Sequence, residues 1–435
     1  MTSAAPVYRI DQPVGFDLTG AELKAAPYPA LARALAAGPV IPVKMPFVGR
    51  VWLATSHAAV AAMLKDNELF VQEGRRAGRS GAGGVDPRWL PSSLRLLMNN
   101  MLLKDEPDHR RLRKLVDQAF RRRGVQDMRP QIEAAADRIL DGFEGIDQVD
   151  LATEYSRRLP LEVICELLGL PHSDREIFSQ WTASIAGLSG FLGLFNALGA
   201  VKRMTAYVRR QIEEVRRSPR PGLISDLVQA EQDGDKLDAD ELIAMVLLLL
   251  VAGFETTTHL VSGAVVDLDA NPDQKAWLLA DLSGRTERAV EELARHVTAV
   301  QATKPRYVAR DADFFGQRLK RGQVVMACLS TANADPAVFE APQKLRLERF
   351  PNPHLAFGAG IHFCLGQQLA RVEAQSALHC LYARYPDLSV IDPDRLDYIK
   401  RMGMRGVNTL PVRLGARTRA TGQRLEAVAS PGQAG

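Results

Sequence analysis

Apolar positions recur with helical spacing through most of the 435-residue chain, and short strand-like runs interrupt them. Amphipathic helices are predicted at 27–38, 57–65, 130–145 and 159–168. One strand hairpin is predicted from 40–43 and 50–54, and a second from 314–317 and 322–325. The chain is therefore expected to consist mainly of helices, with short strands between them.

The stretch Leu242–Ala252 is apolar on all sides and is expected to be a buried helix. Asp238, with Glu241 three residues later, has the pattern of an N-terminal capping box. At 252–257 the sequence Ala-Gly-Phe-Glu-Thr-Thr then places a glycine, an acid and hydroxyls inside this helix. Such a conflict with local propensity indicates a functional site, and a merely kinked core helix is the alternative. Thr256 could bond to the carbonyl four residues back and distort the helix.

A second unusual stretch, Phe357-Gly-Ala-Gly-Ile-His-Phe-Cys-Leu-Gly366, presents Cys364 just before a predicted helix. Helix N-termini and unpaired backbone N–H groups favour negative charge, so the thiolate is expected to be the resting form. The glycines would let the backbone approach a flat group closely. A haem iron needs such an anionic sulfur as its proximal ligand. A lone cysteine would more simply be buried and inert, but the complete pattern favours haem.

This motif resembles that of the cytochrome P-450 family of haem-thiolate monooxygenases, and Asn352-Pro-His-Leu355 before it is similar to the soluble bacterial branch. The resemblance covers residues 20–414 and implies the cytochrome P-450 fold: one large, mainly α domain with a small β-rich region. Residues 1–19 are expected to form a flexible N-terminal segment and residues 415–435 a disordered tail. The implied cofactor is haem b, iron protoporphyrin IX, with Cys364 as the metal ligand. The further cofactor contacts implied are Phe357, Gly358, Gly366 and Ala252.

The resemblance also implies donors to the haem propionates. His109 and Arg113 lie four residues apart on one helix face, and the family places both against a propionate; Arg306 should meet the other, and His362 is a further donor. The neighbouring basic residues Arg110, Arg111, Lys114 and 121–123 are expected to be solvated. Glu292 and Arg295 resemble the family's buried pair, with Arg349 as third partner and a structural role.

Glu255 and Thr256 are the predicted catalytic residues, because an acid and a hydroxyl can relay protons to dioxygen as it is reduced. The reaction implied puts one oxygen atom into a hydrophobic small molecule and releases the other as water. Electrons are expected from a separate ferredoxin-type donor with a nicotinamide-dependent reductase. A peroxide-driven oxygenase on the same fold is one alternative, although such relatives tend to lack the acid–alcohol pair. A non-catalytic haem protein is another, although an electron carrier needs no oxygen groove.

The substrate is not readable from the chain, but an apolar segment at 188–195 resembles the family's mobile lid and favours a hydrophobic molecule. The segment 72–100 is long enough to be a functional loop, and the resemblance implies that it covers the substrate, with Leu94, Leu96, Leu97 and Met98 as candidate contacts. A carboxylated substrate would want an arginine, and Arg75, Arg76 or Arg79 could supply it.

The composition indicates where the protein works and which partners it lacks. With 55 basic and 51 acidic residues the net charge is +4, too weak to indicate nucleic-acid binding. The four cysteines lack CxxC spacing and suit a reducing cytoplasm. Residues 1–15 lack a signal-peptide pattern, and the longest apolar run, 242–253, is shorter than the ~20 residues of a membrane span. We therefore expect a cytoplasmic monomer without membrane attachment.

Overall fold

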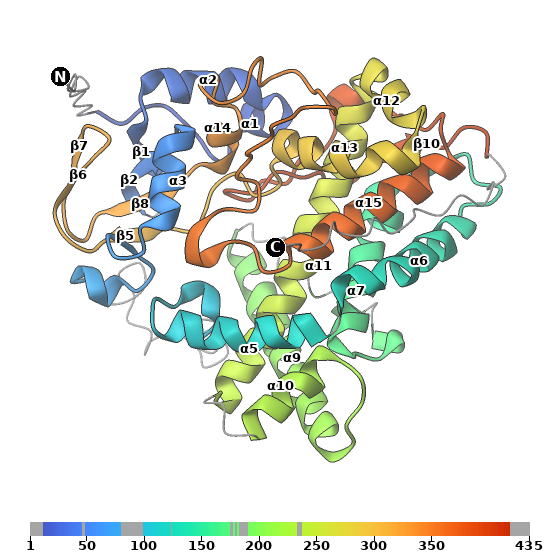
Figure 1. Ribbon diagram of the computed structural model, residues 1–435, viewed down its shortest axis with the longest axis horizontal. Coiled ribbons are helices and arrows are strands. Elements are labelled where there is room, and N and C mark those ends of the chain that lie inside the picture. The colour runs from blue at the N-terminus through green and yellow to red at the C-terminus, as the bar shows by residue number, and fades with distance from the viewer. Residues whose placement is uncertain are drawn as a thin grey trace, which may run out of the picture.

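The computed structural model describes residues 12–45, 48–79, 99–122, 124–174, 177–178, 181, 190–232 and 237–417. The helices are α1 (Ala21–Ala25), α2 (Pro27–Ala37), α3 (His57–Lys65), α5 (Asp108–Arg122), α6 (Arg129–Asp141), α7 (Arg158–Leu168), α9 (Gly190–Arg217), α10 (Leu223–Gln232), α11 (Ala239–Asp269), α12 (Pro272–Leu279), α13 (Leu282–Val297), α14 (Leu329–Asn333) and α15 (Gln367–Arg384). The strands are β1 (Val40–Met45), β2 (Gly49–Ala54), β3 (Phe70–Val71), β4 (Gln148–Asp150), β5 (Arg306–Val308), β6 (Ala312–Phe314), β7 (Gln317–Leu319), β8 (Val324–Ala327), β9 (Ser389–Val390) and β10 (Pro411–Arg413). Figure 1 shows the larger sheet at one side of the helical body, so the expectation of a mainly helical fold with a small β-rich region is confirmed.

The larger sheet has the strand order β1-β2-β8-β5-β3. The predicted hairpin of β1 and β2 is confirmed, with Val40 opposite Ala54 and Met45 opposite Gly49. The second predicted hairpin is wrong, because β6 pairs with β7 and β8 joins the larger sheet beside β2. Phe315 and Gly316 both have positive φ and close the tight turn between β6 and β7. All four residues of β8 are apolar and buried, as suits an interior strand.

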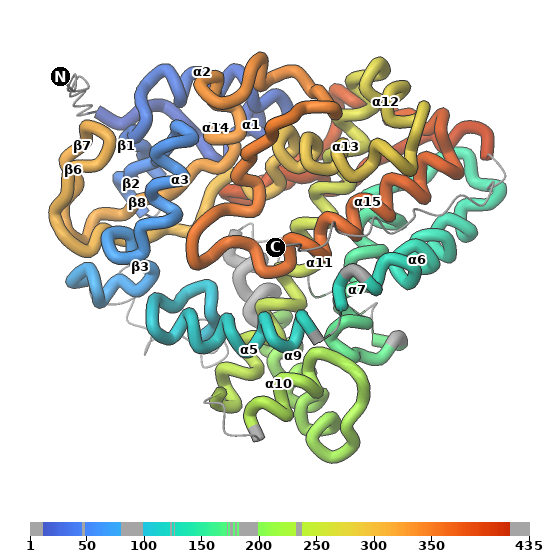
Figure 2. Tube along the Cα trace, viewed as in Figure 1, coloured from blue at the N-terminus to red at the C-terminus, as the bar shows by residue number. Residues whose placement is uncertain are grey.

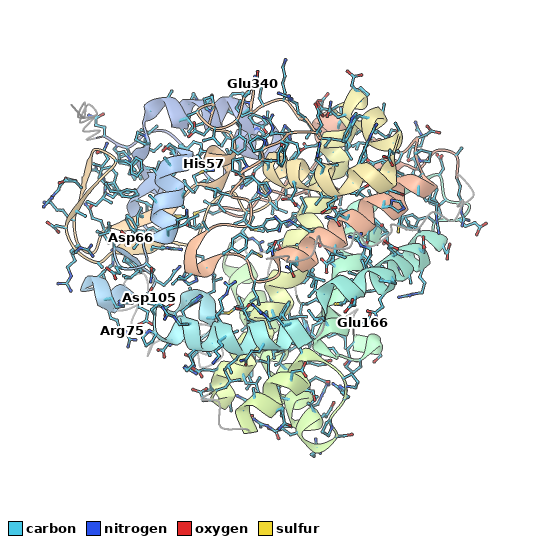
Figure 3. The ribbon with its side chains drawn as sticks, viewed as in Figure 1. His57, Asp66, Arg75, Asp105, Glu166 and Glu340 are labelled. Atoms are coloured by element: carbon cyan, nitrogen blue, oxygen red, sulfur yellow. The ribbon has the colours of Figure 1, made fainter. Side chains whose placement is uncertain are left out.

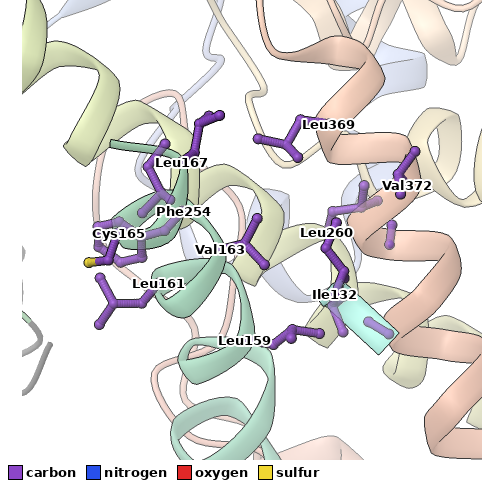
Figure 4. Packing of buried hydrophobic residues seen from close by; sticks show 14 of the residues in the cluster. Ile132, Leu159, Leu161, Val163, Cys165, Leu167, Phe254, Leu260, Leu369 and Val372 are labelled. Atoms are coloured by element: carbon purple, nitrogen blue, oxygen red, sulfur yellow. The ribbon is translucent and has the colours of Figure 1, made fainter. Parts of the chain in front are cut away.

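Helix α11 runs unbroken through the helical body and contacts α7, α9, α13 and α15. Its predicted capping box is present, since the Asp238 carboxylate accepts from Glu241 N at 2.7 Å. Figure 4 shows Val163 of α7, Leu260 of α11 and Val372 of α15 in one packed cluster. Among the described helices, α11 alone is long and apolar enough to cross a membrane by composition, yet 67% of its most apolar window is buried. It is therefore a core helix, as its all-round apolar pattern predicts.

The chain before α1 packs against the sheet. Val14 pairs with Val43, and Phe16 and Leu18 are buried. The N-terminal segment predicted to be flexible is thus packed from Val14 onwards. Its residues 1–11 lie outside the described part of the chain, as do residues 418–435 of the predicted tail.

Candidate functional site

The loop that carries Cys364 lies between α3 and α5 and leads directly into α15 (Figure 2). Cys364 N donates to Phe357 O at 2.9 Å, which folds the loop back on itself. Gly358 and Gly360 have φ of 71° and 72°, a conformation that favours glycine. A Cβ atom at Gly360 would collide with Leu64 O, so this glycine serves packing on α3. A Cβ at Gly358 would meet nothing within 4 Å, so the loop borders open space there.

The Cys364 thiol is half-buried beside the start of α15. Burial raises its pKa above the ordinary value, and the Gly366 backbone N–H, Arg113 and Arg371 oppose that rise. Without a metal ion, desolvation therefore outweighs the helix N-terminus and the backbone N–H groups, which were expected to make thiolate the resting form. A bound cation would be needed to stabilise the thiolate, since metal coordination deprotonates a thiol outright.

The structure brings together the four predicted propionate donors, His109, Arg113, Arg306 and His362, which we call the anchor cluster. The rings of His109 and His362 lie 4.2 Å apart. Arg113 Nη1 donates to Phe363 O at 2.6 Å, and His109 Nε2 lies 2.8 Å from Ile361 O. Burial, then the charges of His109, Arg306 and Arg113, lowers the pKa of His362 to about 3. The four groups are thus close enough to act on one anionic partner.

Two buried nitrogens of the anchor cluster lack a hydrogen-bond partner in the described part of the chain, Arg306 Nε and His362 Nδ1. Arg306 is only 2% exposed, and its Nη1 makes one long bond of 3.4 Å to Met63 O. A buried guanidinium left without an acid costs free energy. These residues therefore fit a cofactor that carries anionic side groups next to the Cys364 loop.

A buried ion-pair network supports the loop, as predicted. Glu292 accepts from Arg295 Nε and Nη2 at 2.7 Å and from Arg349 Nε at 3.1 Å. Asn352 Nδ2 donates to the same carboxylate at 3.2 Å. Arg295 Nη1 donates to Asn333 O, and Asn333 Oδ1 accepts from Leu355 N at 2.7 Å. The pair in α13 thereby holds the chain that enters the cysteine loop.

A second support was missed from sequence. Glu291, next to Glu292, accepts from Arg371 of α15 at 2.5 Å and faces His354 at 3.1 Å. These two hydrogen bonds hold the pKa of Glu291 at about 2 against the effect of burial. Arg371 also stacks over Phe357, 4.3 Å from the ring centroid. No periodic pattern could link Glu291 to Arg371, because they are far apart in the chain. The one signal in the sequence is a basic residue on the helix that follows the cysteine.

Helix α11 exposes one narrow stripe in its buried middle. Leu248, Ala252, Glu255 and Thr256 keep accessible surface, while most neighbouring residues are buried. Thr256 Oγ1 donates to Ala252 O at 3.0 Å, so the predicted bond to the carbonyl four residues back is present. Gly253 instead faces α7, where a Cβ would lie 2.8 Å from Ile164 Cδ1. The stripe, rather than the glycine, is the open face of this helix.

Glu255 is held from the C-terminal loop. Its Oε1 lies 2.7 Å from Arg401 Nη1 and 4.0 Å from His259 Nε2. His259 is buried, and burial, then Arg401 and Arg157, lowers its pKa to about 3. A side chain at Gly406 would occupy the space of the His259 ring. The predicted acid is thus charge-paired beside a neutral imidazole, a setting that the sequence pattern did not indicate.

Two further buried groups near the stripe were missed. Lys24 Nζ makes no ion pair with any acid among the described residues, and it donates to Gln301 Oε1 at 2.6 Å, Met404 O at 2.5 Å and Arg401 O at 3.2 Å. Glu373 of α15 is buried, and burial raises its pKa well above the ordinary value, with the Thr257 hydroxyl opposing. Each has a charged residue two positions before it, Glu22 and Arg371, and reads from sequence as an ordinary surface charge.

Some predicted residues lie elsewhere. Arg111, expected to be solvated, is paired with Glu241 at 2.5 Å. Arg75 pairs with Glu73 at the edge of the molecule seen in Figure 3. Arg76 lies 3.7 Å from Asp105, and Arg79 donates to Gly322 O at 2.9 Å, so each of the three arginines has a partner within the protein. The candidate contacts at 94–98, and residues 188–189 of the predicted lid, lie outside the described residues.

Similar proteins share the whole fold. The model of the family described as Cytochrome P450 matches residues 285–392. Polyketide biosynthesis cytochrome P450 PksS of Bacillus subtilis is 36% identical over 365 residues, 83% of this chain and 89% of that protein. Vitamin D(3) 25-hydroxylase of Pseudonocardia autotrophica is 36% identical over 400 residues, 90% of this chain and 94% of that protein. The crystal structure of myxobacterial cytochrome P450 CYP267B1 with myristic acid superposes with a TM-score of 0.82 at 33% identity, covering 91% of this chain and 98% of that one.

Proposed function

Since this chain belongs to the cytochrome P450 family, we propose that it inserts one atom of dioxygen into a hydrophobic small molecule, using electrons from a separate protein. It is a monooxygenase, and the cofactor of its family and fold is haem b. When bound, haem supplies the iron that activates dioxygen. We assign Cys364 as the metal ligand, the anchor cluster as partner of the propionates, and Phe357, Gly358, Gly366 and Ala252 as the remaining cofactor contacts.

The acid–alcohol pair on the open stripe of α11 carries this proposal. Thr256 Oγ1 already donates to Ala252 O, so its lone pairs are directed away from the helix. Glu255 can take up a proton at Oε2 while Oε1 stays paired with Arg401. We infer that Glu255 brings protons from the direction of the C-terminal loop, and that Thr256 positions them over the stripe. A peroxide-driven enzyme would not need this pair, because peroxide arrives already carrying its protons.

Removing one hydroxyl tests the proton path. Thr256→Ala should leave haem binding unchanged, while oxidation of nicotinamide cofactor yields hydrogen peroxide at the expense of oxygenated product. Thr258→Ala is the matched control, because Thr258 Oγ1 bonds to Phe254 O at 2.9 Å in the same way but is buried. Product and peroxide formed per cofactor oxidised are measured. If Thr256→Ala stays fully coupled, the proposed role of Thr256 is wrong; if the wild type works on peroxide alone, the monooxygenase mechanism is wrong.

The electron donor is proposed to dock on α5. Arg110, Lys114 and Arg121 are exposed and border, together with Arg113, a surface hollow that reaches Ile361 of the cysteine loop. Phe363 of that loop is 38% exposed beside them. The hollow also includes Glu106 and Asp117, but its basic residues outnumber these acids. A net positive face suits an acidic ferredoxin-type protein, whose own donor would be a nicotinamide-dependent reductase.

Charge reversal on α5 tests the docking face. Lys114→Glu with Arg121→Glu should slow reduction by an acidic ferredoxin, most strongly at low salt, and leave peroxide-supported turnover intact. Arg318→Glu with Lys320→Glu, in and beside β7, reverses the same charge on exposed residues far from α5 and is the control (Figure 1). An equal loss of reduction rate in both double variants would mean that the net charge of the protein, and not this face, governs the encounter with the ferredoxin.

For the substrate we propose only a broad class, largely apolar small molecules. The similar proteins act in polyketide biosynthesis, hydroxylate vitamin D(3) or bind myristic acid, and all three ligand types are largely apolar. Leu248 and Ala252 give the stripe an apolar surface of the same kind. We propose that the chain works as a monomer in the cytoplasm, and that its substrate is a hydrophobic molecule that binds this surface.

A further inference from the structure

The imidazole of His259 is a buried polar group in the middle of α11. The residue is only 5% exposed, and neither Nδ1 nor Nε2 makes a hydrogen bond to any described residue. Burying a polar group without a partner costs free energy. A leucine would fill the same space without this cost, so packing alone does not account for a histidine at this position.

The ring lies between the predicted acid and the C-terminal loop. Its Nε2 is 4.0 Å from Oε1 of Glu255, one helical turn earlier on α11. On the opposite side the backbone of Gly406 comes so close that a Cβ atom there would collide with Nδ1. A cavity of about 10 Å³ beside the ring, lined also by Tyr398 and Arg405, has the size of one water molecule. Nε2 therefore faces the acid, and Nδ1 faces the loop.

The surroundings of the ring favour a neutral imidazole. The charged groups on the neighbouring elements are Arg401 and Arg405 of the C-terminal loop and Arg157, the residue before α7. Burial, then Arg401 and Arg157, lowers the pKa of His259 to about 3. A neutral imidazole has one N–H donor and one acceptor nitrogen. If Nε2 carried the hydrogen it would donate to Glu255, but 4.0 Å is beyond hydrogen-bonding range, so Nε2 is the acceptor.

We propose that Glu255 has two positions and that His259 is the positioning residue for the second: ionised, the acid pairs with Arg401, and protonated, it donates to His259 Nε2. This proposal rests on the proposed monooxygenase function and adds the residue that holds the protonated acid. An acceptor nitrogen gains nothing from an ionised carboxylate, which is itself only an acceptor. It gains a hydrogen bond as soon as the carboxylate takes up a proton.

The change of position needs only small movements. Uptake of a proton from water at Oε2 forms an O–H bond and removes the charge that attracts Arg401 Nη1, 2.7 Å from Oε1. A half turn of the carboxyl group and an approach of about 1 Å then bring this O–H within hydrogen-bonding range of Nε2. The imidazole takes up no proton, because it keeps its own hydrogen on Nδ1 and donates that to a water in the small cavity. His259 thus keeps a protonated acid ready beside Thr256.

The pH dependence of coupling tests the pairing. Product per nicotinamide cofactor oxidised should fall as pH rises and the acid loses its proton. Because His259 stabilises only the protonated acid, His259→Leu should move the midpoint of this fall to lower pH, by about 0.4–1.1 units, the value of one hydrogen bond. His259→Gln should restore the profile, since an amide oxygen can accept the same bond. In a Glu255→Gln background, His259→Leu should cause no further loss.

The bond can also be observed without turnover. In the ferrous carbon monoxide complex of the ¹⁵N-histidine-labelled holoenzyme, the Nε2 resonance of His259 should move towards that of a hydrogen-bonded acceptor as pH falls from about 9 to 5. The ring itself stays neutral over this range, so its own titration cannot cause the change. In Glu255→Gln the same resonance should not depend on pH, because the side chain at position 255 no longer titrates.

Three results would overturn the proposal. In the first, His259→Leu is coupled like the wild type at every pH. In the second, His259→Leu loses the same fraction of coupling with and without Glu255→Gln, which would make its role purely structural. In the third, the Nε2 resonance of the wild type is independent of pH, a result that requires no variant to fold. Failure of the monooxygenase function is separate, because the wild type would then lack a thiolate-type carbon monoxide spectrum or form no product from reduced cofactor.

Discussion

Replacing Arg306 by methionine should change the stability of the cofactor-free and the loaded protein in opposite directions. Among the described residues, Nε of the buried Arg306 has no hydrogen-bond partner, and Nη1 has its single 3.4 Å bond to Met63 O. An unsatisfied buried donor costs about 1–3 kcal/mol, which Arg306→Met would recover. With haem bound, the variant loses a bond to a charged carboxylate, about 1.5–3 kcal/mol. The two effects add in the binding equilibrium, so the dissociation constant of haem should rise by about two to four orders of magnitude.

The measurements are denaturant unfolding of the cofactor-free protein and the rate of haem transfer to an excess of apomyoglobin. Arg349→Met is the matched control, because Arg349 is also buried but donates to Glu292 at 3.1 Å. Removing one partner of a buried pair costs about 3–5 kcal/mol, so this variant should be destabilised with and without haem. If cofactor-free Arg306→Met is destabilised like Arg349→Met, the Arg306 guanidinium supports the fold and its anchoring role is wrong.

Two other buried charges give separate predictions. Glu373→Gln should match the wild type near pH 4 and be the more stable protein at pH 8 in urea unfolding. Burial raises the pKa of the folded carboxyl, so above about pH 4.5 the unfolded chain alone releases this proton. Wild-type stability therefore falls as pH rises, by up to about 1.4 kcal/mol per pH unit. A pH-independent difference between the two proteins would contradict a protonated Glu373. Lys24→Met removes donors to Gln301 Oε1 and to the carbonyls of Met404 and Arg401. It should lower the free energy of unfolding by about 1–3 kcal/mol and increase the rate of proteolysis after Arg401. Unchanged cleavage there would show that the loop is held by other contacts.

The parts of the fold that were predictable are those in which one local pattern decides the outcome. The all-round apolar run of α11 and its capping box specify a buried helix with a defined start, and α3 was predicted at its observed bounds, His57–Lys65. The pair Glu292 and Arg295 is three residues apart on one helix, so a local spacing brings it together. The second hairpin was predicted wrongly because β8 takes its partners β2 and β5 from the larger sheet, whereas the tight turn at Phe315 and Gly316 pairs β6 with β7.

What could not be predicted depends on contacts between distant segments. The Arg401 pair with Glu255 joins residues 146 positions apart, and Lys24 meets Gln301 across 277 positions. The burial of Glu373 likewise depends on how α15 crosses α11, which no pattern within α15 encodes. The Cys364 thiol was misjudged for a related reason: the helix N-terminus is visible in the sequence, whereas desolvation depends on what packs over the loop.

The C-terminal loop links the N-terminal helix α1 to the predicted catalytic acid, Glu255. Arg401 pairs with Glu255, Arg405 Nε donates to Lys24 O at 2.9 Å, and Gly406 leaves room for the His259 ring. Lys24 in turn holds the carbonyls of Arg401 and Met404. Loosening α1 would therefore release the loop, and releasing the loop would free Glu255 from Arg401. The ion pair between Glu255 and Arg401 on the open stripe thus depends on packing near the N-terminus, far away along the chain.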